Sequence, residues 1–377
     1  MSVDWNRITF LESAANLKLV LRAQAGRTPP TALAREAAVC LQQGRLFFQS
    51  AERSALEIRP LLLFYGTMAF AKAIVICRNL KRIATLSRSH GIKDVSADNA
   101  RITELAVRPD KVGMFQQFND TVAALNQYKT YGHQGMPQIL SMPAAPSSDL
   151  DSRVITLKDI LARIAALGDI YRRTFHEAPQ TEPYFLYSSA VDPTFWMIQA
   201  WDPEVFEDRA AMRRIVQKWR QRFPVLQRWR VVEAEPAWGR SLVVFGNVAV
   251  PENELDEPLF APLGTKFCAS DNPERNHRCP RLPINELTHP GGSFTSSSLV
   301  APLSGIYLSE YSTHYLGMFL LSSLVRYRPH AWVHAISRTA TTENPADDQA
   351  LALLEEFMRL HAEAIPKLAS DVLNPLD

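Results

Sequence analysis

The sequence has little cysteine and lacks several short signatures that mark common enzyme classes. The 377 residues include four cysteines, Cys40, Cys77, Cys268 and Cys279, so no disulfide framework is expected and a reducing cytoplasm is the predicted location. There is no GxxxxGK[ST] loop, HExxH pair or GxSxG turn. Their absence argues against a P-loop triphosphatase, a zinc protease and an ordinary esterase. The first residues carry early acidic side chains and no long apolar run, so no leader peptide is expected.

Long hydrophobic runs are also scarce. The most apolar stretch, Arg59 to Cys77, is just too short for a membrane span, and Gly66 and Lys72 interrupt it. We therefore expect a helix buried on nearly all sides, and no association with a membrane. With 46% hydrophobic and 21% charged residues, the composition is that of an ordinary globular protein.

An excess of charge of one sign is absent overall, because the formal net charge is only +2. The charge is uneven, however. Residues 1–90 contain thirteen Lys/Arg and five Asp/Glu, whereas residues 341–377 contain two Lys/Arg and eight Asp/Glu. The total charge does not require a nucleic-acid partner, but its distribution permits a basic face.

Apolar residues recur at helical spacing over most of the chain. Thr31 to Ala55 and Glu57 to Leu80 predict two long helices that pack antiparallel, the second with Pro60 in its first turn. Further helices are expected at 156–175, 202–223, 304–327 and 347–373. Between Pro183 and about residue 250, short aromatic and β-branched runs predict a small antiparallel sheet.

We therefore expect a mainly α protein of the α+β class. The helices near both ends of the chain are unusually apolar, and packing them together in one bundle is the simplest way to bury them. The predicted parts are a helical region at 1–150, a mixed α/β insertion at 151–300, and helices that return to the bundle at 301–377.

Two blocks resemble a known family. "IRPLLLFYGTMAFAKAIVI" followed by "SHGI", and "YLGMFLLSSLVRYRPHAW" followed by "LLEEFMRLHAEAIPKL", are similar to the two terminal signatures of YaaC-like bacterial proteins. The resemblance covers both ends of the chain and implies no settled activity. It draws attention to His90 with Arg88 before it, and to Arg326, Tyr327 and Trp332.

A looser likeness concerns the helices between Ala34 and Leu80, which resemble HEPN domains. That resemblance implies a helical bundle, often dimeric, and in many members a metal-independent ribonuclease of a bacterial defence or toxin-type system. The motif of such enzymes is an Arg and a His separated by four to six residues. Arg328 and His334, with five residues between them, fit this spacing. Pro329 directly after the arginine departs from the usual motif.

The chemistry of RNA cleavage suits this pair. Histidine can transfer a proton, and a guanidinium can stabilise charge on a phosphate, which would yield a 2′,3′-cyclic phosphate without a cofactor. On one continuous helix the two side chains would lie some 120° apart. Pro329 disfavours a helical Arg328, and a break there could bring both side chains to one cleft. Alternatively, Arg326 and Arg328 cap carbonyls at the end of a helix.

A second basic stretch is Arg209 to Arg230, with eight Lys/Arg and no acidic residue. On a helix, Arg214, Lys218 and Arg222 form a row that could follow the phosphates of RNA. The alternative is a solvated basic face neutralised by the acidic C-terminal region.

Other candidate sites are less distinctive. Cys268, His277 and Cys279 lack the close cysteine pair of a zinc site, so no metal is expected. Besides an RNA-directed protein, the sequence leaves open a non-catalytic subunit that binds a protein partner in a defence complex, and a protein that binds a small molecule. Whether the protein is an enzyme at all stays open at this point.

Overall fold

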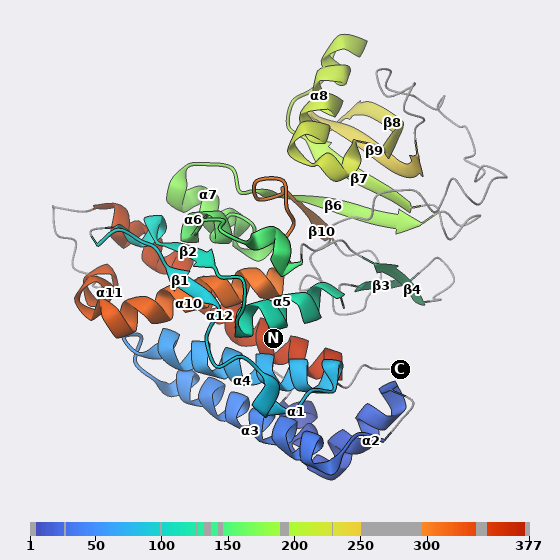
Figure 1. Ribbon diagram of the computed structural model, residues 1–377. Helices are drawn as coiled ribbons and strands as arrows, with labels where there is room; N and C mark the ends of the chain where they lie inside the picture. The colour runs from blue at the N-terminus through green and yellow to red at the C-terminus, as the bar shows by residue number, and fades with distance from the viewer. Residues whose placement is uncertain are drawn as a thin grey trace. The chain divides into compact units, whose positions relative to one another are not determined.

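The structure is a computed structural model (Figure 1) that describes residues 5–25, 28–98, 100–124, 127–131, 137–141, 146–188, 196–227, 229–249, 296–336 and 345–373. The chain forms two compact units. Unit 1 comprises Met1–Leu125, Ala145–Pro179 and Leu308–Asp377, and unit 2 comprises Asn126–Ala144 and Gln180–Tyr307. Compactness does not test whether a part folds by itself, so the domain boundaries expected at 150 and 300 stay predictions.

Unit 1 is a helical bundle that joins segments from both ends of the chain. Its helices are α1 (Trp5–Leu11), α2 (Ala14–Ala25), α3 (Thr31–Arg53), α4 (Arg59–Asn79), α5 (Met114–Ala124), α6 (Leu157–Leu161), α7 (Gly168–Phe175), α10 (Glu310–Tyr327), α11 (Pro329–Ile336) and α12 (Pro345–Leu373). A small antiparallel sheet accompanies them, formed by β1 (Ile92–Asp94), β2 (Ala106–Pro109) and β5 (Ile155–Thr156) in the order β1-β2-β5.

Helix α4 is the centre of this bundle. It packs against α3, α5, α10 and α12, and its buried residues occupy all sides of the helix over most of its length. By length and composition alone α4 could cross a membrane, but 78% of its most apolar 18-residue stretch is buried inside the protein. The expected bundle of N- and C-terminal helices is therefore confirmed, because burying α4 requires apolar partners from both ends of the chain.

The bundle also encloses two histidines. His314 of α10 and His361 of α12 are both fully buried, with ring centroids 5.5 Å apart. The hydroxyl of Thr67 lies 2.7 Å from Nε2 of His361, and Oε1 of Glu310 lies 3.6 Å from Nε2 of His314. Burial lowers the pKa of His314 to about 3, and lowers that of His361 well below its ordinary value. Both imidazoles are therefore neutral in the folded protein at pH 7.

Unit 2 contains the predicted antiparallel sheet. Its strands are β6 (Thr181–Ser188), β7 (Trp196–Asp202), β8 (Trp229–Ala237), β9 (Arg240–Ala249) and β10 (Ser296–Val300), and they lie in the order β10-β6-β7-β9-β8. Helix α8 (Arg209–Arg222) buries Ile215, Val216 and Trp219 in the same core as Val243 and Phe245 of β9. The apolar side of α8 thus belongs to the core of unit 2.

A separate two-stranded hairpin in unit 2 was not expected from the sequence. Strands β3 (Gln127–Tyr131) and β4 (Pro137–Ser141) pair antiparallel, although β4 lies in a proline- and serine-rich segment that reads as a loop. Propensity alone is a weak guide to strands, because cross-strand pairing supplies much of their stability.

Candidate functional site

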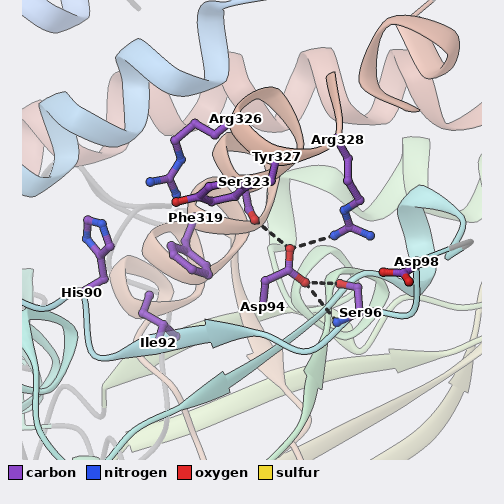
Figure 2. A pocket seen from close by; sticks show the side chains of 10 residues that line it. All are labelled: His90, Ile92, Asp94, Ser96, Asp98, Phe319, Ser323, Arg326, Tyr327 and Arg328. Atoms are coloured by element: carbon purple, nitrogen blue, oxygen red, sulfur yellow. Dashed lines mark hydrogen bonds and ion pairs between the residues drawn. The ribbon is translucent and has the colours of Figure 1, made fainter. Parts of the chain in front are cut away.

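A polar pocket lies in unit 1 at the C-terminal end of α10 (Figure 2). Its volume is about 490 Å³. One wall comes from the end of α10 and the other from β1 with the segments that flank it. We call it the His90 pocket, and it is lined by His90, Ile92, Asp94, Ser96, Asp98, Phe319, Ser323, Arg326, Tyr327 and Arg328.

The helix break expected at Pro329 forms one edge of this pocket. Helix α10 ends at Tyr327, and α11 starts at Pro329. Arg328 between them has φ −136° and ψ 52°, and its backbone N–H still donates to Leu324 O at 2.9 Å. The predicted break is confirmed. Its cause is local, because a residue before proline is disfavoured in helical conformation, whereas proline is tolerated in the first turn of the next helix.

Backbone contacts with the start of α5 position His90 in the opposite wall. The N–H of Phe115 donates to His90 O at 3.0 Å, and the N–H of Met114 donates to Ser89 O at 3.0 Å. Gly91 follows with φ +76°, and a Cβ on it would lie 2.7 Å from the Cα of Gly113. Only glycine fits here without strain or collision with the neighbouring backbone. The "HG" dipeptide in the family-like block thus has a structural reason.

The imidazole of His90 is half-buried against aromatic rings. It meets the ring of Phe64 edge-on at 5.4 Å between centroids and that of Phe319 at 6.1 Å. Burial, and then the positive charges of Arg326 and Lys72, lower the pKa of His90. Its Nδ1 is buried and has no hydrogen-bond partner within the described part of the chain. A neutral imidazole in such surroundings can accept or transfer a proton.

Arg328 is held by an acidic residue from the opposite wall. Its Nη2 lies 2.7 Å from Oδ2 of Asp94, and its Nη1 donates to Ala97 O at 3.2 Å. Ser323 Oγ donates to the same carboxylate oxygen at 2.7 Å, and the N–H of Ser96 donates to the other at 3.0 Å. Burial raises the pKa of Asp94, but these hydrogen bonds and Arg328 outweigh burial, so the net shift is downward.

Arg326 has different partners. Its guanidinium carbon lies 5.8 Å from the ring centroid of Phe64 and 5.0 Å from that of Tyr327, and its Nε donates to Ser322 O at 3.3 Å. Among the residues that the structure describes, no carboxylate pairs with it. Figure 2 shows its guanidinium on the side of the pocket where His90 lies, whereas Arg328 reaches Asp94. The rings and the carbonyl orient Arg326, and no carboxylate of the described residues compensates its charge.

Four of the residues singled out from the sequence line this pocket: His90, Arg326, Tyr327 and Arg328. His334 on α11 and Arg88, two positions before His90, are both exposed, and neither lines the pocket. Trp332 is only 1% exposed and belongs to the core. The catalytic pairing of Arg328 with His334 stays a prediction, and the structure supplies a different histidine beside the arginines.

Sequence reasoning missed Asp94, Ser96, Asp98 and Ser323. Asp94 lies more than 200 positions before Arg328 in the chain, and single aspartates and serines in loops are common. For Asp94, Ser96 and Asp98, the one local signal is the "SHGIKDVSAD" stretch, where polar residues follow directly on the family-like block. Only the packing of α10 against β2 and its neighbours brings them to the arginines.

The basic row of α8 is paired with acids of unit 2. Lys218 Nζ lies 2.9 Å from Oδ2 of Asp202, and Arg222 Nη1 lies 2.7 Å from Oε2 of Glu182. Arg214 is 3.9 Å from Glu204, and both are exposed. The neutralising acids therefore come from β6, β7 and the segment after β7. A role of this row in following phosphates stays a prediction.

Metal ligation has no support in the part of the chain that is described. No group of three or more His, Cys, Asp or Glu residues there could hold a metal ion. Cys268, His277 and Cys279 lie outside the described residues.

A comparison with models of protein families identifies the family of the chain. The family model described as YaaC-like Protein matches residues 9–373. The chain belongs to the YaaC-like family. The match spans both family-like blocks and also the middle of the chain, which the sequence blocks alone did not cover. No curated protein and no solved structure matches this YaaC-like chain significantly.

Proposed function

We propose that this YaaC-family protein is an RNA-directed cytoplasmic protein whose His90 pocket binds a phosphodiester and cleaves it without a metal ion. One observation carries the proposal: the guanidinium of Arg326 is oriented by two aromatic rings, lacks a carboxylate partner among the described residues, and lies near a half-buried neutral histidine. A guanidinium in these surroundings binds phosphate oxygens through charge-assisted hydrogen bonds.

RNA carries its own nucleophile, so the pocket needs to supply only proton transfer and charge stabilisation. In the proposed step, neutral His90 accepts the proton of the 2′-hydroxyl while the bond from O2′ to phosphorus forms. Arg326 stabilises the charge on the non-bridging oxygens. The bond from phosphorus to O5′ breaks, and O5′ takes a proton from the water that reaches this open pocket. The products are a 2′,3′-cyclic phosphate and a 5′-hydroxyl.

This assignment differs from the sequence-based pair in both members. Arg328 is already bound to Asp94, so its charge contributes less to the binding of an anion than that of Arg326. His90 takes the role that the motif spacing suggested for His334. The HEPN likeness, a defence or toxin-type role, a protein partner and a homodimer belong to the same hypothesis and stay predictions.

The test is RNA cleavage in EDTA by the wild type and by Arg326→Ala and His90→Gln, with His334→Ala as the matched control on an exposed histidine. Removing either pocket residue is expected to lower the rate on the order of 100-fold, with the cyclic-phosphate ends lost. His334→Ala is expected to cleave like the wild type. Loss of cleavage only in His334→Ala would assign the activity to the motif pair, and absence of cleavage by the wild type would reject the nuclease proposal.

A second candidate is a protein that binds a small phosphorylated molecule without cleaving it. The volume of about 490 Å³ lies in the range of small-molecule sites. Calorimetry with mononucleotides separates the two candidates. Binding of a mononucleotide that requires Arg326, without RNA cleavage by the wild type, would favour this second function.

A further inference from the structure

Tyr327 is exposed at the mouth of the His90 pocket, although it ends a helix that is otherwise largely buried. Its side chain is 71% exposed, and it lines the same pocket as Arg326 and His90. A large aromatic ring left in water at a charged pocket is unusual for a helix whose other aromatic residues, Tyr311, Tyr315 and Phe319, are buried.

The ring of Tyr327 is oriented by its neighbour. The guanidinium of Arg326 lies 5.0 Å from the ring centroid of Tyr327. Arg326, which is proposed to bind the phosphate, is therefore also the side chain that contacts this ring. A phosphate on Arg326 therefore brings the nucleoside attached to it close to the ring of Tyr327. Aromatic side chains at such positions stack on unpaired bases.

The pocket also carries the negative charge of Asp98, which is suited to bind a nucleobase and not a phosphate. Asp98 is exposed and lines the pocket, and no cation pairs with it among the described residues. Figure 2 shows it beyond Arg328, on the other side of the pocket from His90. A carboxylate repels phosphate oxygens but accepts hydrogen bonds from the N–H groups on a base edge.

From these observations we infer the substrate class of the site: single-stranded RNA in which one unpaired base stacks on Tyr327 and presents N–H donors to Asp98. The inference rests on the proposed function. Guanine offers two adjacent donors, N1–H and N2–H, to one carboxylate, whereas uracil offers one. The pocket is therefore expected to prefer guanine to uracil at this position. An A-form duplex would bind weakly because its base faces are covered by stacking.

The experiment measures binding separately from cleavage. Fluorescence anisotropy in EDTA uses non-cleavable 2′-O-methyl oligonucleotides: a uracil-only strand, the same strand with one guanine, and the guanine-containing strand in a duplex. The proteins are the wild type, Tyr327→Ala, Tyr327→Phe, Asp98→Asn and Arg326→Ala. Tyr327 and Asp98 are exposed, so these substitutions are expected to leave the fold intact.

The expected result is a loss of about tenfold in affinity for single strands with Tyr327→Ala and wild-type affinity with Tyr327→Phe, which keeps the ring. Asp98→Asn is expected to reduce the preference for guanine. If Arg326→Ala weakens binding but Tyr327→Ala does not, or if the duplex binds as well as the strand, the inference is overturned while the proposed function stands. If Arg326→Ala binds every probe like the wild type, the proposed function itself fails.

Discussion

Two basic clusters, one in each unit, look equivalent in the sequence and differ in the structure. Helix α8 presents Arg214, Lys218 and Arg222 at helical spacing, and each has an acidic neighbour in unit 2. The end of α10 presents Arg326 and Arg328, and of these two only Arg328 pairs with a carboxylate of the described residues. The guanidinium of Arg326 instead lies near two aromatic rings, those of Phe64 and Tyr327.

The comparison shows that the number of cations in a stretch does not measure its capacity to bind an anion. What matters is whether a carboxylate elsewhere in the fold already compensates each charge. By this criterion we expect the shorter cluster, with two arginines, to bind an anion more strongly than the row of three on α8. The following predictions test that contrast, from the largest expected effect to the smallest.

The largest effect concerns the stability of unit 1 in acid. The pKa of His314 is lowered to about 3 and that of His361 is also lowered, so the unfolded chain binds more protons than the folded one below about pH 6.5. The stabilisation is complete above that pH. As the pH falls from about 6.5 towards 3, His314 is expected to lower the free energy of unfolding by roughly 1.4 kcal/mol per pH unit. The lowered pKa of His361 adds to this loss.

Urea denaturation between pH 7 and 5 measures this slope. The variant His361→Gln is expected to show a shallower dependence on pH than the wild type, because glutamine does not titrate. His176→Gln, at an exposed position outside the core, serves as the matched control for the loss of one histidine. Equal slopes for His361→Gln and the wild type would show that the acid response of the protein arises elsewhere.

The next prediction compares the two acids that hold basic side chains. Asp94 binds Arg328, and Asp202, which is 2% exposed, accepts from Lys218 and from Trp219 Nε1 at 2.8 Å. Replacing either aspartate by alanine leaves hydrogen-bond donors without their partner, and is expected to cost about 1–3 kcal/mol. Thermal or chemical unfolding measures both.

Anion binding should distinguish these two variants. Asp94→Ala removes a negative charge from the pocket and frees Arg328 to bind a phosphate. RNA affinity is therefore expected to rise by a few-fold, the effect of about one additional phosphate contact. Asp202→Ala is expected to leave RNA affinity unchanged. An equal rise in both variants would mean that the charge of the whole protein, and not of the pocket, governs binding.

A smaller effect is expected from the titration of His90. Its pKa is lowered, so it gains a proton, and a positive charge, only below its ordinary value of about 6.5. RNA affinity at constant salt is therefore expected to increase a few-fold in the wild type as the pH falls below 6.5 through this lowered pKa. His90→Gln should remove this pH-dependent increase, whereas His334→Gln should keep it. A flat profile for the wild type would exclude His90 from contact with the bound phosphate.

The smallest effect is expected on α8. Arg214→Gln breaks an exposed contact of 3.9 Å with Glu204 and should change the free energy of unfolding by no more than about 0.5 kcal/mol. It should also leave RNA affinity near the wild-type value, in contrast to Arg326→Ala. A loss of affinity as large as that of Arg326→Ala would make the α8 row part of the RNA-binding surface and would remove the distinction between the clusters.

Much of the fold was predictable because its causes are local in sequence. Apolar residues at helical spacing placed α3, α4, α8, α10 and α12 near their observed positions, and Pro329 marked the end of α10. The antiparallel sheet of unit 2 followed from its short β-branched runs. The β3–β4 hairpin did not, because the segment of β4 has the composition of a loop.

The candidate site was predictable only in part. His90 and Arg326 were found because both lie in family-like blocks, and Arg328 because of its spacing to His334. His334 lies on α11 and does not line this pocket, whereas His90, which does, comes from the segment after α4. No periodicity in the sequence relates positions 90 and 326.

By itself, the sequence determined which segments are helical, which faces of them are apolar, and where α10 stops, since these properties depend on side chains within a few residues of one another. Only the tertiary structure decided which arginine keeps its charge available. Asp94 and Arg328 are 234 positions apart, and their pairing results from the packing of α10 beside the segment around β1. Electrostatic compensation depends on distance in space, which the order of residues along the chain does not specify.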